Sequence, residues 1–182
     1  MAKQLPIFIT GNQGKADQLA QWLDMPIAHQ KLDLDEIQSL DPRAVVDHKV
    51  RQAYSIAKRP VLVEDVSVVL TAMGKLPGPL IKWFLEELGN EGICKLADSL
   101  PHRKAVASIC YALYDGQEVQ FFEYSKEGEI APEPRGEAWG WNPIFIPAGA
   151  MKTYAEMTPE EVRPVSMRAQ AIEKLREYLQ RG

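Results

Sequence analysis

Three apolar residues, Val61 to Val63, run directly into the acidic pair Glu64 and Asp65. A short apolar run with β-branched members predicts a central strand of a sheet. Burying two carboxylates beside such a strand is costly unless they emerge at a site. Ligands in open α/β sheets gather at the carboxyl ends of the strands. We therefore expect the pair to end this strand. The two carboxylates either belong to a ligand site or have a purely structural role, and the residues alone leave both open.

The segment before this strand predicts a strand, a turn and two helices. Leu5 to Thr10 is typical of a short buried strand, and a helix is expected to begin near Lys15 after a Gly-containing turn. Asp41 is placed as the N-cap of a second helix that has Pro42 at its first position. No repeat or low-complexity tract interrupts the chain, so we expect one domain over residues 1–182.

The remainder of the chain predicts further helices and an antiparallel pair of strands. Helices are expected over residues 81–88 and 91–99 and after the capping-box pattern at Thr158. Strands are expected over 105–114 and 118–124, joined across Asp115-Gly116, which is a strong signal for a two-residue hairpin turn. The predicted fold class is mixed α/β with a curved central sheet and flanking helices.

Composition excludes several classes of protein. The chain has 182 residues and is 46% hydrophobic, which is enough for one globular core. Its net charge of −4 gives no global attraction for polyanions, so we expect no nucleic-acid partner and only a local phosphate site. The apolar stretch Leu5 to Ile9 is too short for a signal peptide or a membrane span, and no membrane partner is expected. Cys94 and Cys110 lack zinc or disulfide-framework spacing, and a cytoplasmic location is expected.

The turn from Thr10 to Lys15 offers backbone N–H groups, an amide and an ammonium between a strand and a helix, which suits a triphosphate. It is neither a Walker loop nor a dinucleotide fingerprint, and taken alone it is more typical of a plain connection. Two acidic clusters could supply the hard oxygen ligands that Mg²⁺ prefers. They are Asp33, Asp35 and Glu36 in one case and Glu64 with Asp65 in the other. Acids in loops are usually only solvated, so the first cluster alone favours no site.

Two later segments could bind a nucleotide base. Trp139-Gly140-Trp141 offers aromatic faces for stacking, although paired tryptophans can equally fill a core. Ser166, Met167 and Arg168 open the last predicted helix, where N–H groups and a guanidinium could meet a base or a phosphate. An arginine on a helix surface is normally only a solvated charge.

In this order the segments resemble the inosine-triphosphate pyrophosphatase family over nearly the whole chain. Six ordered matches carry the resemblance: Thr10-Gly11-Asn12 with Lys15, Leu62 to Asp65, Leu76 to Pro79 with Ile81 to Phe84, Gly140-Trp141 with Pro143, Tyr154 to Met157, and Ser166 with Arg168. The resemblance implies two lobes around a nucleotide cleft and a homodimer. It also implies Mg²⁺-dependent hydrolysis of nucleoside triphosphates, chiefly of non-standard purines such as ITP, dITP and XTP, to the monophosphate and pyrophosphate.

The resemblance also assigns roles to residues. Asp65 would bind Mg²⁺ or deprotonate the attacking water, with Glu64 in support and Glu36 as a second metal ligand. Lys15 would stabilise charge on the leaving pyrophosphate. The triphosphate contacts would be Thr10, Gly11, Asn12, Lys15 and Lys49. The base would be bound by Trp139, Gly140, Trp141, Asn142, Ser166, Met167 and Arg168.

Several positions depart from the family pattern. Asn142 replaces an aspartate, Met167 a histidine and Val162 a lysine, and the spacing from Glu36 to Lys49 is one residue longer. Losing a buried hydrogen-bonding partner changes discrimination by large factors, so base preference stays open. Three alternatives follow: the same reaction on another base, a nucleotide-binding regulatory protein without turnover, and a phosphatase that releases single phosphates.

Overall fold

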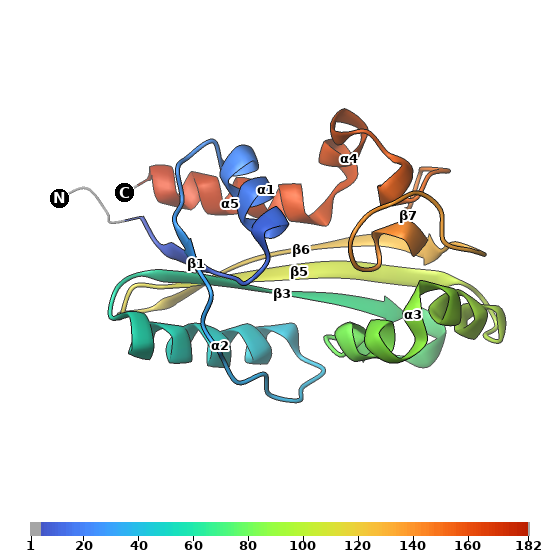
Figure 1. Cartoon of the computed structure of the whole chain (residues 1–182), viewed down its shortest axis with the longest axis horizontal. Coiled ribbons are helices and arrows are strands. Elements are labelled where there is room, and N and C mark those ends of the chain that lie inside the picture. Colours follow the sequence, from blue (N-terminus) through green and yellow to red (C-terminus); the bar gives the residue numbers. More distant parts are fainter. Residues whose placement is uncertain (1–4, 182) are drawn as a thin grey trace. The chain divides into compact units, whose positions relative to one another are not determined.

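The computed structural model describes residues 5–181, and its elements are shown in Figure 1. The chain divides into two compact units. The first contains the described residues up to Asp65, the segment Ile109–Tyr124 and the described residues from Arg168 onward. The second contains Val66–Ser108 and Ser125–Met167. The expectation of one domain over 1–182 stays a prediction.

Helices and strands alternate along much of the chain. The strands are β1 (Ile7–Ile9), β2 (His29–Gln30), β3 (Val61–Leu70), β4 (Pro77–Gly78), β5 (Lys104–Tyr114), β6 (Val119–Ile130) and β7 (Phe145–Pro147). The α-helices are α1 (Gln13–Leu23), α2 (Pro42–Ala57), α3 (Ile81–Asp98), α4 (Pro159–Val165) and α5 (Met167–Gln180). Short 3₁₀ turns, η1 to η3, cover Thr71–Met73, Asn142–Ile144 and Tyr154–Glu156. Within residues 5–181 no helix is long and apolar enough to cross a membrane.

The sheet is mixed and open. Its strand order is β2-β1-β3-β5-β6-β7, and β4 pairs with β3 outside this path. β1 runs parallel to β2 and β3, whereas β4 is antiparallel to β3 and β7 is antiparallel to β6. The predicted mixed α/β class is therefore confirmed.

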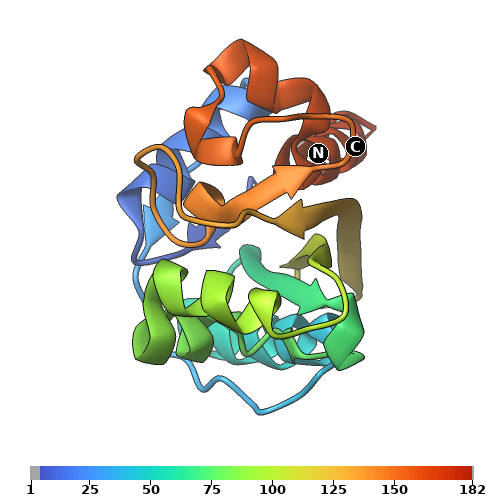
Figure 2. The ribbon, with the colours of Figure 1, turned by 90° about the vertical axis from the view of Figure 1, so that its right-hand side faces the viewer.

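In the first unit helices cover both faces of the strands. Figure 1 shows α2 on one face and α1 with α5 on the other. One core cluster joins α2 to alternate residues of β1, β3 and β5: Ile7, Ile9, Val46, Val50, Ala53, Val61, Val63, Cys110 and Ala112. The intervening residues, including Phe8 and Tyr111, belong to the opposite face because strand side chains alternate. In the second unit α3 and α4 likewise lie on different sides of the strands (Figure 2).

β3 corrects one expectation, because it does not end at the acidic pair. It continues to Leu70, since the residues after Asp65 are again mostly β-branched and pair with β4, with Val68 opposite Gly78. β1 ends earlier: it is paired with β3 only at Val61 and Leu62. The acidic pair therefore lies just beyond the end of β1, in the middle of β3.

The start of α2 was predicted correctly from local signals, whereas the length of the turn between β5 and β6 was not. The Asp41 side chain accepts a hydrogen bond from the Arg43 N–H, with Pro42 at the first position of α2, as expected. The expected two-residue hairpin turn is wrong, because four residues, Asp115 to Glu118, separate β5 and β6. The Asp115 carboxylate accepts the Gln117 N–H at 3.0 Å, and this side-chain turn holds the longer loop.

Gly89 separates the two helical segments that were expected over 81–88 and 91–99, and together they form α3. Its backbone has φ 64° and ψ 177°, a conformation in which a β-carbon is strained. We expect Gly89→Ala to lower the free energy of unfolding in urea by about 1–3 kcal/mol. Lys95→Ala, an exposed change in the same helix, is the control and should stay within about 0.5 kcal/mol of wild type. Equal effects in the two variants would contradict the strain.

Candidate active site

The turn between β1 and α1 is built by side-chain caps. Thr10 Oγ1 accepts the Asn12 N–H at 3.1 Å, and Asn12, the N-cap of α1, accepts the Lys15 N–H through Oδ1 at 3.1 Å. The Thr10 N–H donates to the Gln30 carbonyl at 2.9 Å, which ties the turn to β2. The turn thus presents the positive end of the helix dipole together with the Lys15 side chain.

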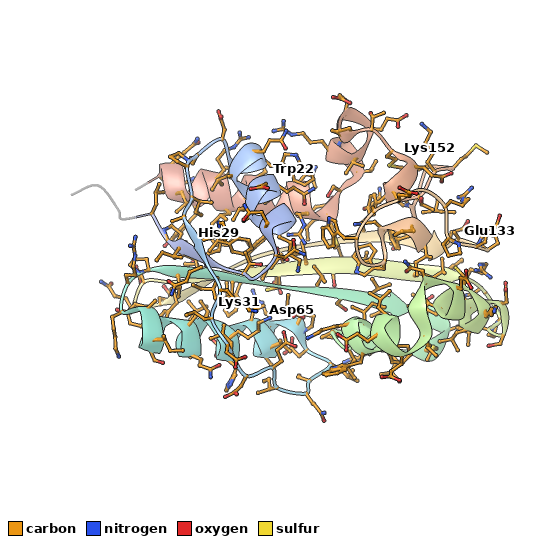
Figure 3. All side chains as sticks on the ribbon, viewed as in Figure 1. Trp22, His29, Lys31, Asp65, Glu133 and Lys152 are labelled. Atoms are coloured by element: carbon orange, nitrogen blue, oxygen red, sulfur yellow. The ribbon has the colours of Figure 1, made fainter. Side chains whose placement is uncertain are left out.

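Gly11 in this turn is closely covered by Lys31. A β-carbon at Gly11 would lie 3.2 Å from Lys31 Cδ, so the alkyl stem of that lysine packs directly on the turn. Lys31 is labelled in Figure 3. Lys31 could not be singled out from the sequence, because its position beside the turn depends on the pairing of β2 with β1. The turn is therefore bordered by a second lysine in addition to Lys15.

Glu64 and Asp65 point to opposite faces of β3, because successive strand residues alternate. Glu64 is buried on the α1 and α5 face, where its Oε1 lies 2.7 Å from Lys15 Nζ. Arg168 binds the same carboxylate with both terminal nitrogens: Nη2 donates to Oε1 at 3.1 Å and Nη1 to Oε2. The Arg168 Nη1 group also donates to the Tyr111 hydroxyl at 2.8 Å. These contacts form a buried polar cluster, the Glu64 cluster: Lys15, Glu64, Tyr111 and Arg168.

The Glu64 cluster keeps its charges. Burial alone would raise the pKa of Glu64, but the charges of Arg168 and Lys15 outweigh it and hold that pKa well below its usual range. Burial likewise opposes the charge of Arg168, and the Glu64 carboxylate reverses this effect and raises the Arg168 pKa. A buried pair of this kind is held ionised by its own partners.

Asp65 lies on the α2 face of β3 (Figure 3). Its Oδ1 is 3.5 Å from Lys49 Nζ, and the same ammonium lies 3.4 Å from Glu36 Oε1 and donates to the Glu64 carbonyl at 3.3 Å. Asp65 Oδ2 is buried and has no hydrogen-bond partner among residues 5–181. Burial raises the pKa of Asp65 to about 6; Lys49 opposes the rise and Glu36 adds to it. An unsatisfied buried carboxylate oxygen calls for a ligand.

The donor set on this face fits a hard divalent cation. Asp65 and Glu36 place two carboxylates around one ammonium, and one of their oxygens, Asp65 Oδ2, is unsatisfied. Within residues 5–181 no group of three or more His, Cys, Asp or Glu side chains is arranged as a metal site. Mg²⁺ does not need such a group, since it is usually held by one or two carboxylates together with substrate phosphates and water.

The residues predicted to bind the base lie mostly in the second unit. Trp139 is 43% exposed, whereas Trp141 is buried and packs against the rings of Phe145 and Tyr154, with centroids 5.6 Å and 6.2 Å away. Gly140, between the tryptophans, has φ 65°, and its carbonyl accepts a hydrogen bond from Asn90. The side chain of Asn142 donates to the Trp139 carbonyl at 2.9 Å and holds the loop. Ser166 and Met167 are buried.

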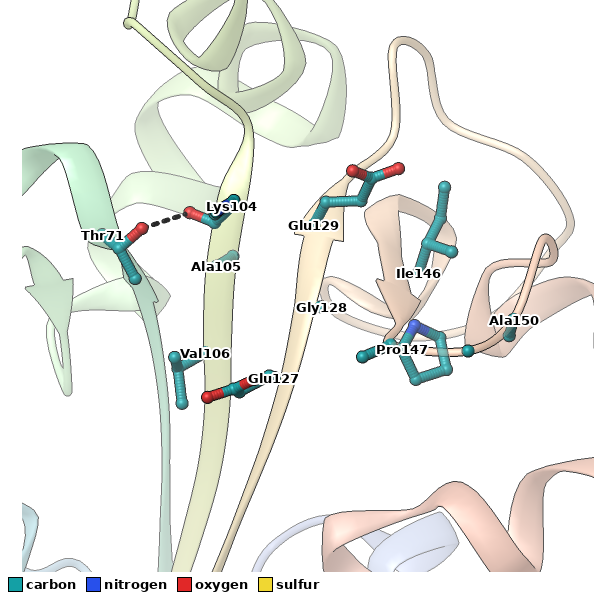
Figure 4. Close-up of a pocket in the computed structure, with 12 residues that line it drawn as sticks. Thr71, Lys104, Ala105, Val106, Glu127, Gly128, Glu129, Ile146, Pro147 and Ala150 are labelled. Carbon is teal, nitrogen blue, oxygen red and sulfur yellow. Dashed lines mark hydrogen bonds between the residues drawn. The ribbon is translucent and has the colours of Figure 1, made fainter.

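A pocket of about 520 Å³ lies elsewhere in the second unit. It is lined by Thr71 of η1, by residues of β5, β6 and β7, and by the loop that follows β7. The Thr71 hydroxyl donates to the Lys104 carbonyl at its rim (Figure 4). Its charged side chains, Lys104, Glu127 and Glu129, are exposed. The pocket includes none of the residues predicted for the site, and it lacks the buried charges of the Glu64 cluster. Size alone does not make it the better candidate.

The sequence pattern that defines the Ham1 family matches residues 6–178. The chain belongs to the Ham1 family. It is 39% identical over 175 residues to "Inosine triphosphate pyrophosphatase 2" of Trypanosoma cruzi, covering 93% of this chain and 89% of that protein. It is 38% identical over 179 residues to "Inosine triphosphate pyrophosphatase" of Yarrowia lipolytica, covering 95% and 94%. A solved Ham1 structure from Coxiella burnetii has a TM-score of 0.85 at 24% identity, covering 98% and 100%, and confirms the fold.

The predicted resemblance to inosine-triphosphate pyrophosphatases is thus confirmed at the level of family. The structure of this Ham1 protein brings Lys15, Glu64 and Arg168 together on one face of β3, and Glu36, Lys49 and Asp65 on the other. In the structure the Arg168 guanidinium binds Glu64 and Tyr111. Its contact with a base stays a prediction.

Tyr111 was not found by sequence reasoning. It stands inside an apolar strand pattern, where a tyrosine is ordinarily a core residue. Its contact with Arg168, which joins residues 57 positions apart, distinguishes it from Tyr114, the other aromatic residue of β5.

Trp139 and Trp141 should respond differently to substitution. We expect Trp139→Ala to raise the KM for a purine nucleotide about fivefold to 100-fold, if its exposed face stacks on the base. Its melting temperature should hardly change. Trp141→Phe should lower the free energy of unfolding by about 1–3 kcal/mol, because core contacts are lost. Steady-state kinetics and thermal melting separate the two. An unchanged KM for Trp139→Ala would remove Trp139 from the site.

Proposed function

We propose that this chain hydrolyses (deoxy)nucleoside triphosphates that carry non-standard purines, such as ITP, dITP and XTP, to the monophosphate and pyrophosphate. The observation that carries the proposal is the unsatisfied Asp65 Oδ2, buried beside Lys49 and Glu36 just beyond the end of β1. The names of the relatives that are 38% and 39% identical support the reaction and the substrate class.

The polyphosphate would be bound at the turn between β1 and α1. Thr10, Gly11 and Asn12 contribute the turn, whose N–H groups and helix dipole favour an anion. Glu64 fixes the Lys15 ammonium at 2.7 Å, and Lys49 is held by carboxylates on the other face. Fixed cations of this kind stabilise charge that develops on a leaving pyrophosphate without reorganising during the reaction.

Asp65 would act on the attacking water. Its Oδ2 is buried and has no hydrogen-bond partner among residues 5–181, so this oxygen is available to accept a proton from a water molecule. The water oxygen forms a bond to the α-phosphorus, its proton passes to Asp65, and the bond from that phosphorus to the bridging oxygen breaks to release pyrophosphate. Asp65 and Glu36 would also hold a divalent cation, Mg²⁺ in this proposal, which when bound neutralises phosphate charge and makes a bound water more acidic.

The family resemblance further supports a cytoplasmic homodimer with Mg²⁺ as its cofactor. Light scattering coupled to size exclusion measures the assembly directly, and a monomer at micromolar concentration would contradict it.

The deciding experiment is a panel of inosine, xanthosine, guanosine, adenosine and pyrimidine triphosphates, with products identified by ³¹P NMR. We expect pyrophosphate and a monophosphate, fastest from inosine or xanthosine, with loss of turnover in EDTA and recovery with Mg²⁺. Orthophosphate as the first product would favour the phosphatase alternative, and binding without turnover would favour a regulatory protein. Faster turnover of a nucleotide with a standard base would favour the alternative of the same reaction on another base, which the departures at Asn142, Met167 and Val162 allow.

A further inference from the structure

We propose that Tyr111 is a positioning residue: through Arg168 and Glu64 it fixes the ammonium of Lys15, and so sets the affinity for the polyphosphate end of the nucleotide. The inference rests on the proposed function and deepens it, because it adds a residue that would touch neither substrate nor cation. Four residues from four elements of the first unit, β5, α5, β3 and α1, form the chain of contacts.

The contacts run through shared atoms. Arg168 Nη1 donates to the Tyr111 hydroxyl at 2.8 Å, and Nη2 donates to Glu64 Oε1 at 3.1 Å. The same Oε1 lies 2.7 Å from Lys15 Nζ. The oxygen that holds the lysine is therefore one that the guanidinium orients. A guanidinium is planar, so a contact that fixes one of its terminal nitrogens also fixes the direction of the other.

Because the Tyr111 hydroxyl is buried, its loss should affect the residues that it contacts. Tyr111 is fully buried, Arg168 is 5% exposed and Glu64 is 6% exposed, so water cannot readily replace a lost partner. Burial, with the Glu64 charge as a lesser cause, raises the pKa of Tyr111 well above its usual value, and the hydroxyl stays neutral. Networks in such surroundings are coupled more strongly than exposed pairs.

Packing alone does not need the oxygen. The Tyr111 ring lies 6.3 Å from the ring of Phe8, a contact that phenylalanine would keep. Lys15, in contrast, has a long flexible stem and is partly exposed, so its location depends on the carboxylate that holds it. A change at Tyr111 should therefore be felt at Lys15 as well as in stability.

The test is a double-mutant cycle with Tyr111→Phe and Lys15→Met, and inorganic pyrophosphate in a Mg²⁺ buffer is the probe. By titration calorimetry we expect Tyr111→Phe to weaken pyrophosphate binding about fivefold in the wild-type background, within the range of coupling in one network. In the Lys15→Met background the same change should have no further effect. The KM for inosine triphosphate should rise by a similar factor, and kcat should change by less than about twofold.

Tyr114→Phe is the matched control. It lies three positions further along β5, its ring packs on Tyr54 at 4.9 Å, and it should leave pyrophosphate affinity unchanged. If Tyr111→Phe does not fold, Arg168→Lys takes its place, because it keeps the charge but loses the planar fork. It should show the same loss, again only when Lys15 is present.

Equal weakening with and without Lys15, or none in either background, would overturn the positioning role while wild-type turnover left the proposed function standing. A changed melting temperature with unchanged pyrophosphate affinity would do the same. If the wild-type chain neither binds pyrophosphate nor releases it from any triphosphate, the proposed function fails and this inference fails with it.

Discussion

Asp65→Asn is expected to lower kcat by about 100-fold to 10,000-fold, the range for losing a positioned general base. The substitution keeps the size and polarity of the side chain but removes its charge and its ability to accept a proton. Because Lys15 and the turn from Thr10 to Asn12 are untouched, the KM should change by less than about tenfold. The measurement is pyrophosphate release from inosine triphosphate, with thermal melting to show that the variant is folded.

Asp33→Asn is the control for this prediction. Asp33 is an exposed acid of the loop before α2, in the cluster that the sequence alone left as solvated charge. Its substitution should leave kcat within about twofold, as a surface change away from a site ordinarily does. Near-normal turnover in Asp65→Asn, or a loss in Asp33→Asn of the same size, would refute the role of Asp65.

Arg168→Met is expected to lower the free energy of unfolding by about 3–5 kcal/mol, which is typical when one partner of a buried ion pair is removed. The change leaves Glu64 buried without one of its two cationic partners, and it leaves the Tyr111 hydroxyl without its donor. Methionine fills part of the volume, so the loss reports mainly the uncompensated charge. Urea unfolding measures it.

The comparison for this variant is Arg51→Met. Arg51 pairs with Asp47 one helical turn away on α2, and both side chains are well exposed, at 55% and 37%. Solvent screens such a pair, so its loss should cost less than about 1 kcal/mol. If Arg168→Met were no more destabilising than Arg51→Met, the Glu64 cluster would not behave as a desolvated network.

The elements that could be predicted from the sequence are those fixed by local signals. Asp41 and Pro42 begin α2 because an N-cap and a fixed φ act within one turn, and the same holds for the capping box at Thr158. The end of β3 could not be found in this way. Its continuation depends on β4, which pairs from beyond a tight loop, and no property of Glu64 or Asp65 indicates that partner.

For the site, the identity of several residues could be predicted, but their placement in the fold could not. The resemblance identified Lys15, Lys49, Glu64 and Asp65, and the structure places all four around one stretch of β3. It could not show which helices Glu64 and Asp65 each face, because that depends on how the other elements pack on the two sides of β3. The ion pair between Arg168 and Glu64 could not be predicted either, because the two residues lie 104 positions apart in the sequence.

The alternation of Glu64 and Asp65 makes the length of β3 a functional quantity. Inserting or deleting one residue just before this pair would exchange the two faces, so that Glu64 would point toward α2 and Asp65 toward α1 and α5. A change of two residues would return each side chain to its present face. Evolutionary change in this strand is therefore limited by whether a length change is odd or even, as well as by the chemistry of the side chains. Substitutions can be sampled one at a time, but changes of length can be accommodated only in even steps.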